Sequence, residues 1–234
     1  MKIALISDLH ANVPALRAVL EAIDRSGAEH TYCLGDIVDL GPDPSEVIEL
    51  LQRRDIPCLM GNHDPFTGPP TVPEAIYAWT LTQLCDSELA WLRALPRELA
   101  FEFGEQRLLC VHGSPRAYDE QILDATSSAE LDVMLAGASC DVLACGHTHV
   151  QLVRQHRTVT IVNSGSVGMP FESAFTGNGS PRIHSWAEYA LIEFGSGRVS
   201  AELCRVDYDI EAYFSRVRAR MPDPEGWISA WLPP

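Results

Sequence analysis

The amino-acid sequence contains no run of about 18 apolar residues, the length that a membrane-spanning helix requires. Its first residues reach Asp8 before any apolar segment is long enough for the core of a signal peptide. No run of five basic residues is present, and 32 Asp and Glu outnumber 17 Lys and Arg, for a net charge of −15. We therefore expect a cytoplasmic protein that binds neither membranes nor nucleic acid, because binding to a phosphate backbone depends on Lys and Arg.

The seven cysteines are odd in number and form no C-x-x-C motif, the spacing typical of redox pairs and of structural zinc sites. Most of them lie in apolar runs, such as Cys110 within residues 108–111. This pattern predicts reduced, buried thiols rather than a disulfide framework.

Short apolar runs alternate with helical patterns in the first half of the chain. Hydrophobic residues make up 46% of the 234 residues, which is typical of a folded protein and, at this length, of one domain over 1–234. The strand-like runs lie at 3–6, 31–34, 56–60, 108–111 and 141–145. Helical spacing follows from Pro14 to Gly27, from Pro44, in two segments of 73–95, and over 127–137. This alternation predicts an α/β fold with a mostly parallel sheet.

The later part of the chain has a different character. A hairpin is predicted over 98–111, and strands are predicted within 157–163 and 188–207, which favours antiparallel partners and a second sheet packed on the first. Residues 168–187 lack periodicity and are interpreted as a lid or an insertion loop. The segment 209–234 is expected to form a helix followed by a docked tail.

Polar side chains follow the predicted strands at the points where these strands end. They are Asp8, His10, Asp36, Asn62, His112, His147 and His149. Because the carboxyl ends of parallel strands form one crevice, we expect these side chains to converge. Oxygen and imidazole donors without thiolates suit Mn²⁺, Fe, Zn²⁺, Ni²⁺ or Co²⁺, and seven ligands fit two ions that share one carboxylate.

Five motifs stand in the order found in the calcineurin-like metallophosphoesterases. They are Asp-Leu-His at 8–10, Gly-Asp-Ile-Val-Asp at 35–39, Gly-Asn-His-Asp at 61–64, His-Gly at 112–113 and Gly-His-Thr-His at 146–149. With residues 7–12 and 163–168, the chain most resembles the small bacterial and archaeal phosphodiesterases of that family. The resemblance implies a four-layer α/β/β/α sandwich of two mixed sheets flanked by helices.

The resemblance also implies roles for individual residues. One divalent ion, most readily Mn²⁺, would take Asp8, His10, Asp36 and His149, and the other would take Asp36, Asn62, His112 and His147. A water or hydroxide between the ions is the expected nucleophile. His63 would bind phosphate or protonate the leaving group, and Asp64 would orient His63.

Further residues are weaker candidates for binding the substrate. Asn12 could touch the substrate or cap a helix, and Asn163 could reach the site or form a turn. Arg116 and Arg182 could each bind a second phosphate. Asp39 could support the Asp36 loop or be solvated.

The leading hypothesis is a two-metal hydrolase that acts on phosphodiesters or dinucleoside polyphosphates. One alternative is a phosphomonoesterase that acts on small phosphorylated metabolites or nucleotides at the same site. The other is a catalytically weak nucleotide-binding or scaffold protein, which would be expected to lack some of the ligands. The sequence leaves the oligomeric state open.

Overall fold

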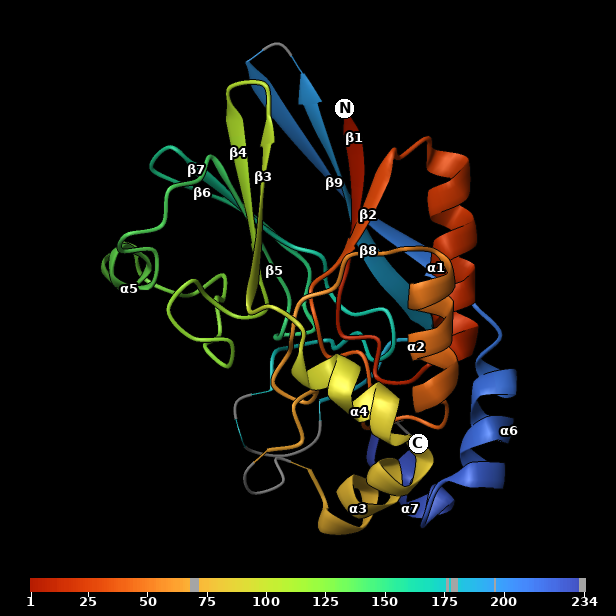
Figure 1. Ribbon diagram of the computed structural model, residues 1–234. Helices are drawn as coiled ribbons and strands as arrows, with labels where there is room; N and C mark the ends of the chain where they lie inside the picture. The colour runs from red at the N-terminus through yellow and green to blue at the C-terminus, as the bar shows by residue number, and fades with distance from the viewer. Residues whose placement is uncertain (68–71, 176, 178–180, 196, 232–234) are drawn as a thin grey trace.

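The computed structural model describes residues 1–67, 72–175, 177, 181–195 and 197–231. Two mixed sheets form its centre (Figure 1). The first has the order β2-β1-β8-β9, from β1 (Lys2–Ile6), β2 (His30–Cys33), β8 (Trp186–Gly195) and β9 (Arg198–Asp207). The second has the order β3-β4-β5-β7-β6, from β3 (Glu98–Phe103), β4 (Gln106–Val111), β5 (Val142–Cys145), β6 (Leu152–His156) and β7 (Val159–Asn163).

The parallel strands are divided between the two sheets. β1 pairs with β2 in parallel in the first sheet, whereas β8 and β9 join it antiparallel. In the second sheet β4, β5 and β7 are parallel, and β3 and β6 are antiparallel at the edges. The expected second sheet is therefore present, but no single mostly parallel sheet forms from the described residues of the first half of the chain.

The hydrophobic core is divided into layers that match a four-layer sandwich. Side chains such as Leu5 and Val142 fill the space between the sheets. On the outer face of the first sheet, Ile6 packs with residues of α1 (Val13–Ser26) and α2 (Pro44–Arg53). On the outer face of the second sheet lies α5 (Ser128–Met134), whose Leu131 belongs to that side's core (Figure 1). The predicted α/β/β/α architecture is thus confirmed.

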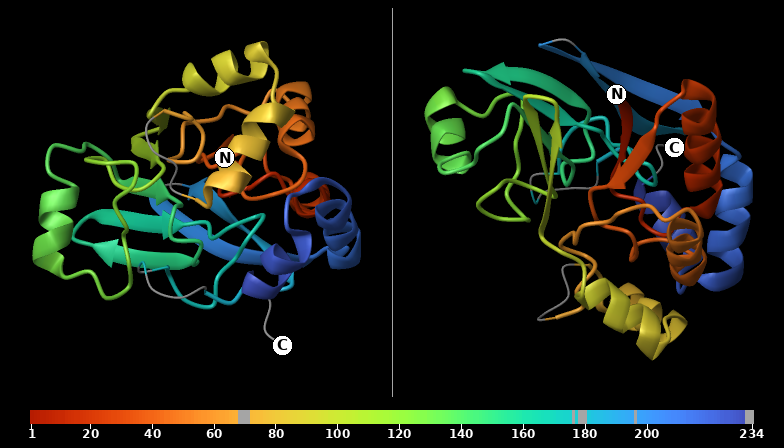
Figure 2. Two further views of the ribbon diagram at one scale, coloured as in Figure 1. Left: turned by 90° about the horizontal axis from the view of Figure 1, so that it is seen from below. Right: turned by 45° about the horizontal axis from the view of Figure 1, so that its top comes forward.

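The remaining helices gather at the end of the sandwich where the parallel strands finish. They are α3 (Glu74–Gln83), α4 (Asp86–Arg93), α6 (Ile210–Arg220) and α7 (Pro224–Trp231) (Figures 1 and 2). A smaller apolar cluster there joins Ile76 of α3 to Trp227 of α7, together with Met169 and Phe171. Part of the expected 168–187 loop and the last three residues of the tail lie outside the described residues.

Local sequence signals set several boundaries. Asn12 caps α1 by accepting a hydrogen bond from the backbone of Ala15, and Gly27 ends that helix at φ 75°. The prediction of a strand at 56–60 was wrong, because only an isolated bridge pairs Cys58 with Cys33. Pro57 has no backbone N–H to donate, and Met60 N donates to the loop before β3. β6 was not anticipated.

The thiols and the helices agree in part with the sequence expectations. All seven cysteines are free, and five are buried, but Cys85 is exposed and Cys204 is half-buried.

No helix in the described part of the chain combines the length and apolar character needed to cross a membrane.

Candidate metal centre

The predicted donor residues meet at one end of the sandwich, below the ends of β1, β2, β4 and β5 (Figure 1). The first donor set consists of Asp8, His10, Asp36 and His149, whose ligand atoms all lie within 4.8 Å of one another. The second donor set consists of Asp36, His112 and His147, which meet the same limit, and Asn62, whose Oδ1 lies 3.1 Å from His112 Nε2. Asp36 belongs to both sets, so one carboxylate can serve two ions.

The loops that carry these donors adopt unusual backbone conformations. Five of the donors have positive φ values: Asp8 (53°), His10 (42°), Asp36 (52°), His147 (66°) and His149 (57°). This left-handed region is costly for residues with a Cβ, and such strain persists where the surrounding structure overdetermines it. Here the loops after β1 and β2 are joined by hydrogen bonds from Asp8 N to Gly35 O (3.0 Å) and from His10 N to Asp36 O (3.1 Å).

Gly61 allows the segment that carries Asn62 to approach Asp36 closely. A Cβ at Gly61 would overlap the backbone nitrogen and the carboxylate of Asp36. The close approach lets His63 N donate to Asp36 Oδ1 at 2.9 Å. The glycine of the Gly-Asn-His-Asp motif is therefore required by packing against the shared carboxylate.

Backbone carbonyls hold three of the histidine rings. Nδ1 of His112 donates to Leu34 O at 2.7 Å, and Nδ1 of His149 donates to Met169 O at 2.7 Å. The carbonyl of Asp119 accepts a hydrogen bond from the ring of His147. A proton fixed on Nδ1 leaves Nε2 of His149 with a lone pair for the centre, the tautomer that binds metals, and His112 reaches the same tautomer when it loses its second proton.

The first donor set leaves polar atoms that a cation would satisfy. Asp8 Oδ1 is buried and accepts no hydrogen bond within the described residues. It lies 3.4 Å from His149 Nε2, and His149 Nε2 in turn lies 3.0 Å from His10 Nε2. Burial lowers the pKa of His10 to about 4, so its ring is neutral at pH 7. A buried carboxylate oxygen and two imidazole nitrogens thus converge at one place, an arrangement that fits a divalent ion.

The second donor set is electrostatically different because His112 lies next to Asp36. Burial alone would lower the pKa of His112, but the Asp36 carboxylate, 3.2 Å from Nε2, raises it to about 10. In the first donor set, burial raises the pKa of Asp8 to about 7. The protein without an ion therefore carries a proton on His112 that a bound cation would displace.

The expectation that Asp64 orients His63 was wrong. Asp64 is fully buried, and its carboxylate accepts backbone N–H bonds from Asp36 (2.9 Å), Ile37 (2.8 Å), Val38 (3.3 Å) and Gly61 (2.8 Å). Its oxygens are thus committed to the turn that carries the shared carboxylate. Asp64 positions Asp36 and, within the described residues, makes no hydrogen bond to the His63 ring.

Asp39 is the carboxylate that contacts His63, a partnership that the sequence analysis missed. His63 Nδ1 lies 3.2 Å from Asp39 Oδ2, while Thr80 and the backbone of Leu40 donate to Asp39 Oδ1. Burial alone would lower the pKa of His63, but Asp36 and Asp39 raise it to about 9. A charged His63 therefore lies beside the donors, with Nε2 3.9 Å from Asp36 Oδ2. The second Asp of the Gly-Asp-Ile-Val-Asp motif is the signal that could have identified this pair.

Each of the four weaker substrate-binding candidates has a structural partner or is exposed. Asn12 caps α1, and its Nδ2 donates to Gly168 O at 3.1 Å. Asn163 is fully buried and donates to Gly146 O (2.7 Å) and Thr148 Oγ1 (3.0 Å), so it holds the loop that carries His147. Arg116 is paired with Glu120, and Arg182 is exposed. Their roles in binding the substrate stay predictions.

Phe171 supports the centre from the loop after β7. Its ring stacks on His149 with centroids 4.2 Å apart at 17° and is only 8% exposed. This residue therefore fixes the orientation of a histidine donor, and it is too buried to offer a free face to a substrate base.

Comparison with known proteins agrees with this geometry. The sequence profile of the calcineurin-like phosphoesterase superfamily domain matches residues 1–178. Among solved structures, a metallophosphoesterase from Sphaerobacter thermophilus is 30% identical with a TM-score of 0.74, covering 98% of each chain.

Two named relatives have stated activities. The phosphodiesterase YfcE of Escherichia coli strain K12 is 27% identical over 180 residues, covering 73% of this chain and 81% of that protein. The symmetrical bis(5′-nucleosyl)-tetraphosphatase of Paracidovorax citrulli is 28% identical over 149 residues, covering 58% of this chain and 52% of that protein. The second match thus spans about half of that relative's length.

Proposed function

This chain belongs to the calcineurin-like phosphoesterase superfamily and is a metal-dependent phosphoesterase, and from that premise we propose that it hydrolyses small phosphodiesters or dinucleoside polyphosphates. The family predicted from the five motifs is thereby confirmed. The substrate proposal rests on similarity to a phosphodiesterase and a dinucleoside tetraphosphatase. The single observation that carries the chemistry is the pair of donor sets that share Asp36.

We assign one divalent ion to each donor set. The first ion would be held by Asp8, His10, Asp36 and His149, and the second by Asp36, Asn62, His112 and His147. Mn²⁺ suits these nitrogen and oxygen donors, and no thiolate is among them. When bound, such ions supply an activated water at neutral pH and neutralise the charge of the phosphoryl group. Asn62 contributes an oxygen without adding negative charge.

The protein's own residues orient and protonate the substrate. His63 follows the donor Asn62 and is held by Asp39, so its charged ring can bind a phosphoryl oxygen or donate a proton to the leaving oxygen. Asp39 acts as a positioning residue because it contacts the His63 ring rather than the reacting atoms. Asp64 and Gly61 keep the Asp36 turn in place.

Substrate preference is tested with two chromogenic esters and a dinucleotide. The purified protein is analysed for bound metal and then assayed with Mn²⁺ on bis-p-nitrophenyl phosphate, p-nitrophenyl phosphate and diadenosine tetraphosphate. We expect a higher kcat/KM for the diester or the tetraphosphate than for the monoester. A preference for the monoester would establish the phosphomonoesterase alternative. Bound metal without turnover of any substrate would favour a binding or scaffold protein.

The shared carboxylate gives the sharpest test of the two-ion assignment. Asp36→Asn should lose one or both ions and nearly all turnover, because the amide supplies one donor oxygen where the carboxylate supplies two. Asp55→Asn is a matched control, since Asp55 is an exposed residue after α2. Retention of two ions and full turnover by the Asp36 variant would reject the assignment.

A further inference from the structure

The two donor sets differ in their exposure to solvent. Asp8, His10, Asp36 and His149 are at most 5% exposed. In contrast, Asn62, His63 and His147 are half-buried. A substrate must therefore approach from the side of the second donor set, and residues at that opening can contact the part of the substrate beyond the reacting phosphorus.

The register of the second sheet places Arg97 at this opening. Glu98 at the start of β3 pairs with Val111 at the end of β4. Arg97 directly precedes β3, and His112 directly follows β4. The pairing of their neighbours therefore brings the backbone of Arg97 close to that of His112, a member of the second donor set.

The segment 93–97 also runs along the loop that carries Asn62 and His63. The carbonyl of Pro96 accepts a hydrogen bond from Met60 N at 2.8 Å. A second hydrogen bond joins the same two segments, because Arg93 Nε donates to Pro65 O at 3.3 Å. Two arginines thus flank the segment between Met60 and Pro65, which carries Asn62.

A tyrosine holds the guanidinium of Arg97 and connects it to the third member of the second donor set. The guanidinium carbon of Arg97 lies 4.1 Å from the ring centroid of Tyr118. The next residue, Asp119, accepts the hydrogen bond from the ring of His147 through its carbonyl. Stacking against the ring orders the side chain and leaves the edges of the guanidinium free to bind an anion with two hydrogen bonds.

Neither arginine is neutralised by a carboxylate. Within the described part of the chain no ion pair joins Arg93 or Arg97 to an acidic side chain, whereas the nearby Arg116 is paired with Glu120. In a protein of net charge −15, two unpaired arginines beside a phosphoryl site form a local binding position for an anion. A second phosphate of a substrate is an anion that such a position would bind.

We infer that Arg97, stacked on Tyr118, forms with Arg93 a subsite for a second phosphate group of the substrate, which makes a phosphoanhydride such as a dinucleoside polyphosphate preferred over a simple diester. This inference rests on the proposed function and names its substrate class. The subsite binds the phosphate chain next to the bond that is cleaved and takes no part in bond breaking.

The test compares Arg97→Gln and Arg93→Gln with the wild-type enzyme, loaded with Mn²⁺, on two substrates. Diadenosine tetraphosphate carries further phosphates, and bis-p-nitrophenyl phosphate has only the reacting one. Loss of a charged hydrogen-bond donor should lower kcat/KM for the tetraphosphate by about 10- to 100-fold, mainly through KM. Activity on bis-p-nitrophenyl phosphate should stay within about twofold. Tyr118→Phe should retain the preference because it keeps the ring.

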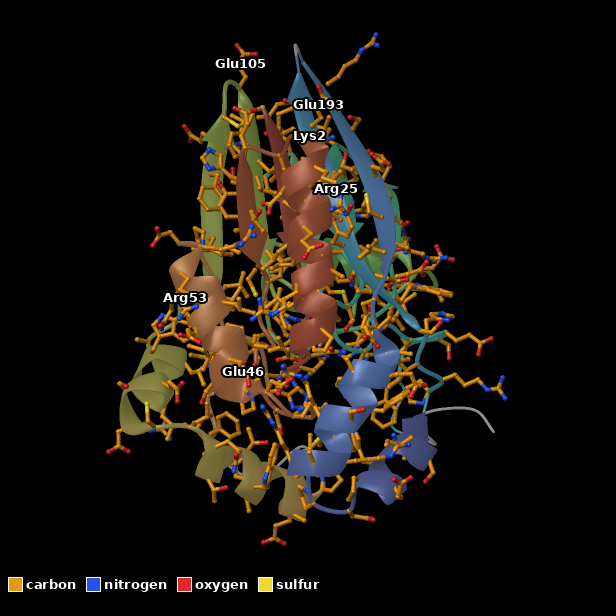
Figure 3. The ribbon with its side chains drawn as sticks, turned by 90° about the vertical axis from the view of Figure 1, so that its right-hand side faces the viewer. Lys2, Arg25, Glu46, Arg53, Glu105 and Glu193 are labelled. Carbon is orange, nitrogen blue, oxygen red and sulfur yellow. The ribbon has the colours of Figure 1, made fainter. Side chains whose placement is uncertain are left out.

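Arg25→Gln is the matched control, because it removes the same charge from a residue near the far end of α1 (Figure 3). We expect it to leave both activities unchanged. Equal losses on both substrates in the Arg97 variant, or no loss on the tetraphosphate, would overturn the subsite. A wild-type enzyme that hydrolyses the diester but not the tetraphosphate would overturn it as well. Absence of turnover on every substrate would instead refute the proposed function.

Discussion

Replacing Asp64 by Asn separates a role in positioning Asp36 from a role in orienting His63. One Asp64 oxygen accepts N–H bonds from Asp36 and Gly61, and the other accepts them from Ile37 and Val38. An asparagine has one such oxygen, and its amide group would point N–H donors at two further N–H donors. Two of the four backbone bonds must therefore be lost.

The magnitude follows from these bonds. A hydrogen bond to a charged acceptor contributes about 1.5–3 kcal/mol, so the loss of two has an upper value of about 6 kcal/mol. Burial raises the pKa of Asp64 to about 6, which shows that its buried charge is itself costly, and the neutral amide removes that cost. We therefore expect a net destabilisation of about 3 kcal/mol, or about 6–12 °C in Tm for a chain of this size.

Thermal unfolding and metal analysis measure this effect together. Asp64→Asn should lower both Tm and the number of bound ions, because the turn that carries Asp36 loosens. Asp39→Asn is the comparison variant, since Asp39 contacts the His63 ring rather than the backbone of Asp36. If Asp64→Asn kept the Tm and metal content of the wild type and shifted only the pH dependence of turnover, Asp64 would be the partner of His63 after all.

The other predictions concern the second donor set and its supports. His63→Ala should retain both ions and slow hydrolysis by about 10²-fold or more, which is the effect of losing an acid catalyst. Steady-state kinetics and metal analysis measure the two effects, and full activity of the variant would show that His63 has no role. Asp39→Asn should shift the loss of activity at alkaline pH to a lower pH, because Asp36 and Asp39 together raise the pKa of His63 and the variant keeps only Asp36; a pH–rate profile identical to that of the wild type would exclude this partnership. Gly61→Ala should reduce metal content and Tm, since the added Cβ would overlap Asp36. Unchanged metal content and Tm would contradict the close approach of residue 61 to Asp36. In the ion-free protein the pKa of His112 is raised to about 10, so its second proton is present at pH 7 and must leave when metal binds. Calorimetry in buffers of different ionisation enthalpy should therefore detect proton release, and Mn²⁺ should bind more tightly as the pH rises from 7 to 9. Mn²⁺ binding without proton release would disprove this prediction.

Much of the candidate centre could be predicted from the sequence because each donor stands in a short motif next to an apolar run. Asp8, Asp36 and His112 follow the ends of β1, β2 and β4 within three residues. β1 and β2 are parallel neighbours in the first sheet, and β4 belongs to the second sheet, so the donors meet between two sheets rather than at the edge of one. Helix α1 was equally predictable, since a cap, a proline and a terminal glycine lie within the local sequence. These signals depend on neighbours only a few residues apart.

Other assignments depended on contacts between distant segments. His63 contacts Asp39 rather than Asp64, because the oxygens of Asp64 accept backbone N–H groups from residues 36–38 and from Gly61. The role of Asn163 as a support for the loop at His147 likewise requires knowledge of its hydrogen bond to Gly146 O. Neither adjacency nor residue type distinguishes these possibilities.

The sequence alone thus determined which donors are present, in what order, and that the donors other than Asn62 follow strands, because chemical identity and hydrophobic period are local properties. Only the tertiary structure decided which carboxylate serves His63, that residues 56–60 make a single bridge rather than a strand, and that Arg97 lies beside His112. The physical reason is that hydrogen-bond partners and strand register are set by the packing of segments tens of residues apart, which no local pattern encodes.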